Sequence, residues 1–146
     1  GIHFLRDFDS DDIGSHLFGY TKTYRGLGVY INTILNVKKD DKTANYIQAF
    51  MNDGVTPINV MKTVGEQNCA AFVRNLPEEK PLLMRMEYHK QKVFVLTYDY
   101  DKEDFVQGLS FEADLDYPGV WLLTAGNGLK NPDHTYVESF AIYNTE

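Results

Sequence analysis

Two short stretches of the sequence carry oxygen-bearing side chains whose spacing suits a bound cation. Residues 26–36 (GLGVYINTILN) predict a strand that runs into a loop with Asn32 and Asn36, and Asp53 follows seventeen residues after Asn36 within an Asn-Asp-Gly turn. Calcium binds several oxygen ligands, and neighbouring loops supply them as carboxylate, amide and backbone oxygens. Asn and Asp-Gly also mark ordinary turns, so these residues alone leave both interpretations open.

Other reactive side chains form no recognisable catalytic arrangement. The four histidines are scattered, and no serine lies in a Gly-x-Ser-x-Gly turn. Glu112 and Asp114 share one face of a predicted strand, but surface charge explains this pair more simply than a glycosidase acid pair. The acidic run from Asp7 to Asp12 lacks the Gly and Glu that an EF-hand needs at positions 6 and 12. The sequence therefore predicts a protein that is not an enzyme, and a sandwich glycan hydrolase is a distant alternative.

The composition is that of one folded domain, residues 1–146. With 43% hydrophobic and 24% charged residues the chain is not of the disordered class. Its net charge of −7 argues against nucleic-acid binding, which depends on Lys and Arg. No apolar run approaches the roughly 20 residues of a membrane span. Since the chain begins at Gly1, a processed or trimmed product is one expectation. Cys69 is its one cysteine, so we expect no internal disulfide.

Short apolar and alternating segments separated by turn residues predict an all-β sandwich of antiparallel sheets. We expect Val37–Asn45 to be a charged hairpin-like connection, Val55–Cys69 to be irregular, and His89–Lys92 to join two strands as a hairpin. The predicted strands are residues 1–8, 27–35, 46–51, 81–89, 92–100, 105–115, 119–124 and 135–144.

The order of these motifs resembles the legume-type (L-type) lectin domain. The features that carry the resemblance are the 26–36 strand and loop, the Asn-Asp-Gly turn, and residues 119–129 (GVWLLTAGNGL) followed by Asp133-His134. The similarity is closest to the mannose-binding cargo receptors of the early secretory pathway. It implies a concanavalin-like jelly roll, a calcium ion that orders the sugar-binding loops, and glycoproteins of the secretory pathway as ligands.

Carried onto this chain, the resemblance implies two sets of residues. The calcium ligands are Asn32, the Ile34 carbonyl, Asn36 and Asp53, with Asn32 standing where the family has a charged Asp. The sugar-binding residues are Asn36, Phe50, Gly126, Asn127 and Gly128, with Phe50 standing where the family has His. The family disulfide is absent because Val106 lies where the partner of Cys69 belongs.

The resemblance also implies that this chain corresponds to the C-terminal part of a longer lectin domain. Family domains have further strands on the N-terminal side, and open sheet edges are a liability when nothing covers them. We therefore expect a partner segment or partner chain that supplies those strands. The main hypothesis is a carbohydrate-binding module for mannose-type glycans with a weakened calcium site. The alternative is a lectin-like scaffold that has lost sugar binding and serves as a protein-interaction subunit.

Overall fold

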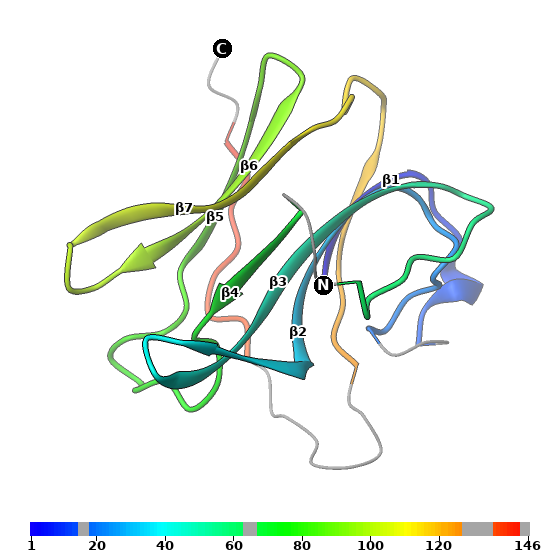
Figure 1. Cartoon of the computed structure of the whole chain (residues 1–146). Coiled ribbons are helices and arrows are strands. Elements are labelled where there is room, and N and C mark those ends of the chain that lie inside the picture. The colour runs from blue at the N-terminus through cyan, green and yellow to red at the C-terminus, as the bar shows by residue number, and fades with distance from the viewer. Residues whose placement is uncertain (15–17, 63–66, 127–135, 144–146) are drawn as a thin grey trace.

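Two antiparallel sheets make up the chain in the computed structural model, which describes residues 1–14, 18–62, 67–126 and 136–143 (Figure 1). The larger sheet has five strands in the order β4-β3-β2-β1-β8, and the smaller has three in the order β5-β6-β7. The predicted all-β sandwich is confirmed. The strands are β1 Ile2–Asp7, β2 Arg25–Lys39, β3 Lys42–Asp53, β4 Asn68–Ala71, β5 Met84–His89, β6 Lys92–Asp99, β7 Asp104–Glu112 and β8 Val120–Leu123.

The long hairpin of β2 and β3 forms the centre of the five-stranded sheet. Asp40 and Asp41 join the strands with φ of 51° and 61°, the left-handed conformation that two-residue hairpin turns require. The hairpin predicted at residues 37–45 is confirmed, but its turn is limited to Asp40 and Asp41, because both strands continue through the charged residues on either side. The strands can be polar at this point because the tip of the hairpin is exposed on both faces and packs against no core.

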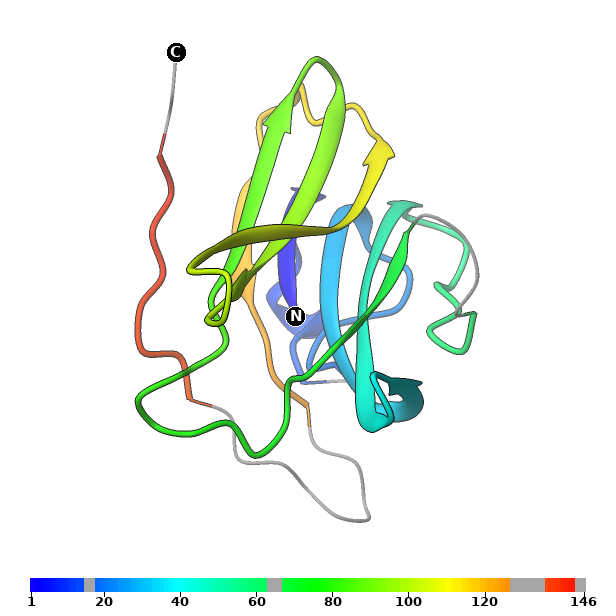
Figure 2. The same ribbon diagram turned by 60° about the vertical axis from the view of Figure 1, so that its left-hand side comes forward.

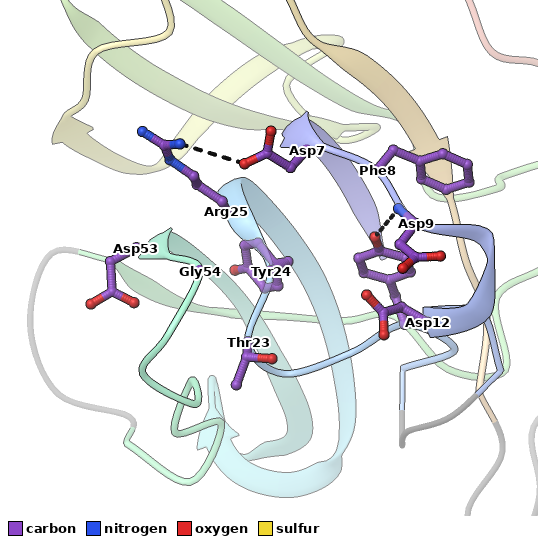
Figure 3. A pocket seen from close by; sticks show the side chains of 10 residues that line it. Asp7, Phe8, Asp9, Asp12, Thr23, Tyr24, Arg25, Asp53 and Gly54 are labelled. Carbon is purple, nitrogen blue, oxygen red and sulfur yellow. Dashed lines mark hydrogen bonds and ion pairs between the residues drawn. The ribbon is translucent and has the colours of Figure 1, made fainter.

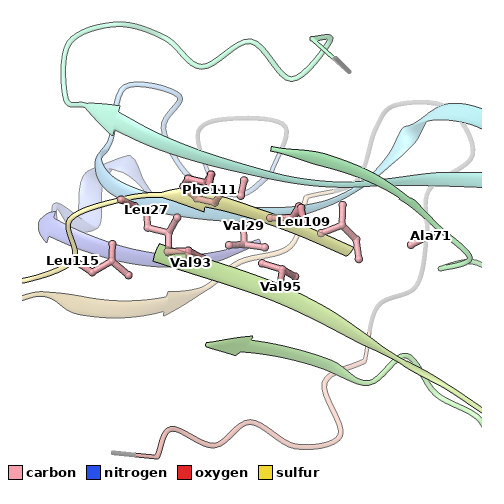
Figure 4. Packing of buried hydrophobic residues seen from close by; sticks show 11 residues of the cluster. Leu27, Val29, Ala71, Val93, Val95, Leu109, Phe111 and Leu115 are labelled. Carbon is pink, nitrogen blue, oxygen red and sulfur yellow. The ribbon is translucent and has the colours of Figure 1, made fainter. Parts of the chain in front are cut away.

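The main hydrophobic core lies between the two sheets (Figure 4). Successive side chains on a strand point to opposite faces, so Leu27 and Val29 of β2 face the smaller sheet, where they meet Val93 and Val95 of β6. The predicted hairpin at His89–Lys92 is confirmed, with Lys90 and Gln91 at φ of 51° and 55°.

A second buried cluster covers the outer face of the five-stranded sheet. Tyr30 points outward from β2 and packs with Leu5 of β1 and with Tyr20 and Tyr24 from the segment before β2. His3 is fully buried among the three tyrosine rings, and its Nε2 lies 2.7 Å from the Tyr30 hydroxyl. This aromatic cluster fixes the segment that precedes β2 against the sheet.

Two further predictions differ from the structure. Asn68–Ala71 is a strand at the edge of the larger sheet, where irregular structure was expected up to Cys69. The predicted strand 135–144 is not formed in residues 136–143, which run as an extended segment along the side of the sandwich (Figure 2). These residues are not paired as a strand, although the Phe140 ring lies against Trp121 of β8 with the ring centroids 6.5 Å apart. In the described residues the only helix is the short η1, Ser10–Asp12, and no helix there is long and apolar enough to cross a membrane.

Candidate functional site

The register of the β2–β3 hairpin decides where the predicted calcium ligands lie. Asp53 pairs with Arg25 at one end of β2, whereas Asn32 pairs with Tyr46 nearer the other end. Arg25 and Asn32 are seven residues apart on one strand, and at ~3.3 Å per residue this is roughly 23 Å. The structure therefore does not bring Asp53 to the other three predicted ligands.

Asn32 is fully buried, and hydrogen bonds inside the protein occupy both ends of its amide. Its Nδ2 donates to Gln48 Oε1 at 2.8 Å and to the Val60 carbonyl at 3.3 Å. Its Oδ1, the atom that would bind a cation, accepts the Ile34 backbone N–H at 3.0 Å. This side chain ties β2 to β3 and to the segment before β4.

Asn36 uses its side-chain oxygen in a similar way. Asn36 Oδ1 accepts a hydrogen bond from Asn45 Nδ2 at 2.9 Å across the hairpin. The same Asn45 nitrogen donates to the Leu35 carbonyl at 2.8 Å and to the Thr33 carbonyl at 3.4 Å. These contacts lie where the register of β2 against β3 shifts, between Asn32 and Val37.

The predicted ligands consequently do not fit a single calcium site in this structure. Calcium takes 6–8 oxygen ligands at about 2.3–2.6 Å, but the Asn32 and Asn36 oxygens face N–H donors, and the carboxylate of Asp53 is at the far end of the sheet. Among the described residues no three His, Cys, Asp or Glu side chains lie close enough together to hold a metal ion. Calcium binding stays a prediction of the family resemblance.

The predicted sugar-binding residues are also spread over the sheet. Phe50 lies on β3, five residues beyond Asn45, so at ~3.3 Å per residue it is roughly 17 Å from the Asn45 contact with Asn36. The Phe50 ring packs on Tyr30 with its centroid 6.0 Å away. Gly126 follows β8 at the end of the sheet where β2 carries Asn32. Asn127 and Gly128 lie outside the described residues.

A different cleft opens at the Asp53 end of the sheet, with a volume of about 600 Å³ (Figure 3). Asp53 lies on one side of it and Asp9 and Asp12 on the other, with Thr23 and Tyr24 between them. The rim carries Asp7 and Arg25, which form an exposed ion pair of 3.5 Å, a type of pair that contributes little to stability.

An aromatic pair stands beside these carboxylates. The rings of Phe8 and Tyr20 are stacked with centroids 6.2 Å apart and an angle of 9° between their planes. Phe8 is 41% exposed, whereas Tyr20 is buried and its hydroxyl accepts the Asp9 backbone N–H at 3.2 Å. The cleft therefore offers an accessible ring next to carboxylate oxygens and one guanidinium group.

The carboxylate of Asp53 is held in place by the turn that follows β3. Its Oδ1 accepts the backbone N–H groups of Val55 and Thr56, both at 2.8 Å, and its Oδ2 accepts the Thr56 hydroxyl at 2.9 Å. The Thr56 backbone hydrogen bond, followed by that of Val55, lowers the pKa of the Asp53 carboxyl. The side chain is ionised at neutral pH and oriented before any ligand arrives.

Sequence reasoning missed this cleft for an identifiable reason. The acidic residues from Asp7 to Asp12 stood out in the sequence, but they were compared only with the calcium-binding loop of an EF-hand. These residues line the cleft because they lie opposite Asp53. Their position follows from the strand register, in which Asp7 pairs with Arg25 and Arg25 pairs with Asp53. Had this strand order been predicted, the same cluster would have been found from the sequence.

Comparison with known proteins agrees with the fold. The family model described as "Legume-like lectin family" matches residues 8–141, a range that includes every strand except β1 and every lining residue of the cleft except Asp7. Neither the curated proteins nor the solved structures gave a match to the chain. The match covers most of the sequence, and the two antiparallel sheets are those of a lectin-type sandwich. The chain belongs to the legume-like lectin family.

Proposed function

We propose that this chain is a carbohydrate-binding module that holds a neutral, mannose-type glycan in the cleft between Asp9 and Asp53. The family match over residues 8–141 is the observation that carries the proposal, because the family suggests a lectin-like module. The same membership supports a protein that binds glycans rather than one that cleaves them.

The side chains of the cleft suit a polyhydroxylated ligand. The carboxylates of Asp9 and Asp53 are acceptors for sugar hydroxyl groups, and Arg25 is a donor. The partly exposed ring of Phe8 offers an apolar surface to the C–H face of a sugar. In the part of the chain that the structure describes, no group of three His, Cys, Asp or Glu side chains could hold a metal ion. A few fixed polar groups beside aromatic surface are typical of small-ligand sites.

Calorimetric titration of a high-mannose oligosaccharide tests this proposal. We expect binding by the wild-type chain and a loss of affinity of about tenfold or more, equivalent to ~1.4 kcal/mol, in Phe8→Leu and in Asp9→Asn. The second variant keeps a side chain that can cap η1 while it removes the charge. Glu112→Gln is the matched control, since it removes one exposed carboxylate at a distance from the cleft.

Two results would contradict the proposal at different levels. If Asn36→Ala abolished binding while both cleft variants bound normally, the sugar site would lie at the other end of the sheet and only the assignment of the cleft would fail. If the wild-type chain bound no glycan on a broad array at millimolar concentration, the carbohydrate-binding function itself would fail.

The cargo-receptor resemblance supports a finer proposal, in which the ligands are glycoproteins of the secretory pathway. Its test is the location of the full-length gene product, tagged and expressed in its own cells. Staining outside the endoplasmic reticulum and Golgi would contradict it.

A lectin-like scaffold that binds other protein segments is the second candidate function. Residues 136–143 carry exposed apolar side chains without strand pairing, among them Phe140, which is 43% exposed, and Ile142, which is 56% exposed. In the described part of the chain, β5 and β8 each pair on one side only, so both offer backbone groups to a further strand. Such a strand is the partner segment or partner chain expected from the sequence.

Sedimentation velocity and hydrogen exchange test this second candidate. A partner strand would slow exchange at the open edge of β5 or β8, and Ile142→Glu would weaken its binding if the 136–143 segment takes part. Exchange that stays fast at both edges in the full-length protein would rule out strand addition there.

A further inference from the structure

The nitrogen of one buried side chain lies where three oxygen atoms from residues 33–36 of β2 converge. Asn45 is 3% exposed, and its Nδ2 contacts the Leu35 carbonyl at 2.8 Å, Asn36 Oδ1 at 2.9 Å and the Thr33 carbonyl at 3.4 Å. A set of backbone carbonyls and a side-chain oxygen around one centre is how proteins surround a calcium ion. Here an NH₂ group with two polarised N–H bonds is at the centre.

A second pair of amides holds the neighbouring segment. Gln48 is fully buried, and its Nε2 donates to the Val60 carbonyl at 2.9 Å, to Asn68 Oδ1 at 3.1 Å and to the Lys62 carbonyl at 3.3 Å. Carbonyl oxygens only accept, so the nitrogen of Gln48 must face them. Its oxygen is then turned toward Asn32 Nδ2, 2.8 Å away. The two amides are therefore fixed in one orientation.

Together these contacts connect the irregular part of β2 to β3 and to the segment before β4. Asn45 holds the irregular part of β2, and Gln48 with Asn32 joins that part to the 60–62 segment and to the start of β4. Each oxygen that a cation would need at Asn32 or Asn36 is already paired with a donor. Buried amides that are fully hydrogen-bonded stabilise a structure without the cost of burying charge.

We propose that the buried amides of Asn45, Asn32 and Gln48 take the place of a metal ion in ordering residues 33–36, the part of β2 where its register against β3 shifts. Folding of this chain and the order of that part of β2 then do not depend on calcium. The inference concerns stability and local order and does not rest on the proposed glycan binding, so either can fail alone.

Thermal unfolding of the full chain in chelator and in millimolar calcium is the first test. We expect the two Tm values to agree within about 1 °C, since a ligand that binds only the folded state would raise Tm. A rise of several degrees in calcium that disappears in Asn36→Ala or Asp53→Ala would overturn the proposal. This measurement uses the wild-type chain for its main result, so it stands even if a core variant fails to fold.

The second test removes the amide at the centre of the oxygen set. Asn45→Ala removes the donor of the two short hydrogen bonds to the Leu35 carbonyl and Asn36 Oδ1. We expect Tm to fall by about 5–10 °C and backbone amide exchange to quicken at residues 33–36. Gln107→Ala, which removes an exposed amide on β7, is the matched control and should leave both quantities unchanged. Equal behaviour of the two variants would overturn the role assigned to Asn45.

Discussion

Gly28 occupies a position where the smallest side-chain addition should have a large effect. A Cβ atom built on Gly28 would lie 2.6 Å from the Tyr24 hydroxyl oxygen and 2.7 Å from that of Tyr30. Both tyrosines are nearly fully buried, and both hydroxyls are in use: that of Tyr24 donates to the Phe50 carbonyl, and that of Tyr30 contacts His3 Nε2. Neither ring can move away without breaking a buried hydrogen bond.

The sign of the Gly28→Ala effect follows from comparing two magnitudes. Where the backbone suits alanine, this change stabilises a protein by about 0.4–1 kcal/mol through the unfolded state. Overpacking of a well-filled core costs about 1–3 kcal/mol, and each buried hydrogen-bonding group left unsatisfied costs about 1–3 kcal/mol more. We therefore expect the free energy of unfolding to fall by about 3 kcal/mol, measured by urea unfolding at neutral pH.

A double-mutant cycle isolates the contact responsible. Tyr24→Phe removes the nearer of the two hydroxyl oxygens, so the cost of Gly28→Ala should shrink by about 1 kcal/mol or more in that background. If Gly28→Ala were as stable as the wild type, or if its cost were unchanged by Tyr24→Phe, the packing described for this outer aromatic cluster would be refuted.

Three further predictions concern the strands around this cluster. Burial, with the nearby amino terminus adding to it, lowers the pKa of His3 from 6.5 to about 4. As pH falls from 6.5 to 4, the unfolded chain therefore binds a proton that the folded chain does not. The free energy of unfolding should drop by about 3 kcal/mol over that pH range. Urea unfolding at several pH values should show this dependence, and His3→Gln should remove most of it. Tyr117→Phe removes the 2.7 Å hydrogen bond from the Tyr117 hydroxyl to the Phe4 carbonyl and should lower the unfolding free energy by about 1 kcal/mol, whereas an unchanged urea midpoint would contradict that role. Gly26→Ala places a Cβ against the Phe4 carbonyl at a φ of 131° and should cost about 3 kcal/mol or more, so a soluble variant with wild-type Tm would show that β1 and β2 are not paired as described.

Much of the fold was accessible from the sequence because apolar residues follow strand periodicity. The prediction of strand 27–35 follows from its apolar run, and the alternation around residues 81–100 indicated two strands and their hairpin, which became β5 and β6. The connection predicted at residues 37–45 was too long because residues 38–43, at the tip of the hairpin, are exposed and have no hydrophobic pattern that reveals a strand. Residues 136–143 do have the composition of a strand. A strand also requires hydrogen bonds to another strand, and the pattern of residues within a segment does not show whether such a partner exists.

The candidate site was less accessible because its prediction depended on register. The spacing along the chain suggested that Asn36 and Asp53 could bind the same calcium ion, since a flexible connection at residues 37–45 would let their side chains come together. A two-residue turn at Asp40 and Asp41 forbids it, because residues on opposite arms of a tight hairpin meet only when they are similarly distant from the turn. The turn is made by two aspartates rather than by the Asn-Gly or Asp-Gly pairs that mark such hairpins most clearly, so its length was hard to predict from residue types.

The amide side chains of this loop explain why residue type alone could not decide between a metal site and a hydrogen-bond network. An asparagine oxygen that binds calcium and one that accepts an N–H group are the same atom in the same kind of loop. What separates the two roles is the identity of the group opposite, and here Asn45 is opposite Asn36 and Gln48 is opposite Asn32. Both partners lie on β3. The tight turn sets a register that places Asn45 and Gln48 beside Asn36 and Asn32, and it places Asp53 beside Arg25 at the other end of β2. One structural feature, the length of the β2–β3 turn, therefore accounts both for the missing carboxylate and for the amides found in its place.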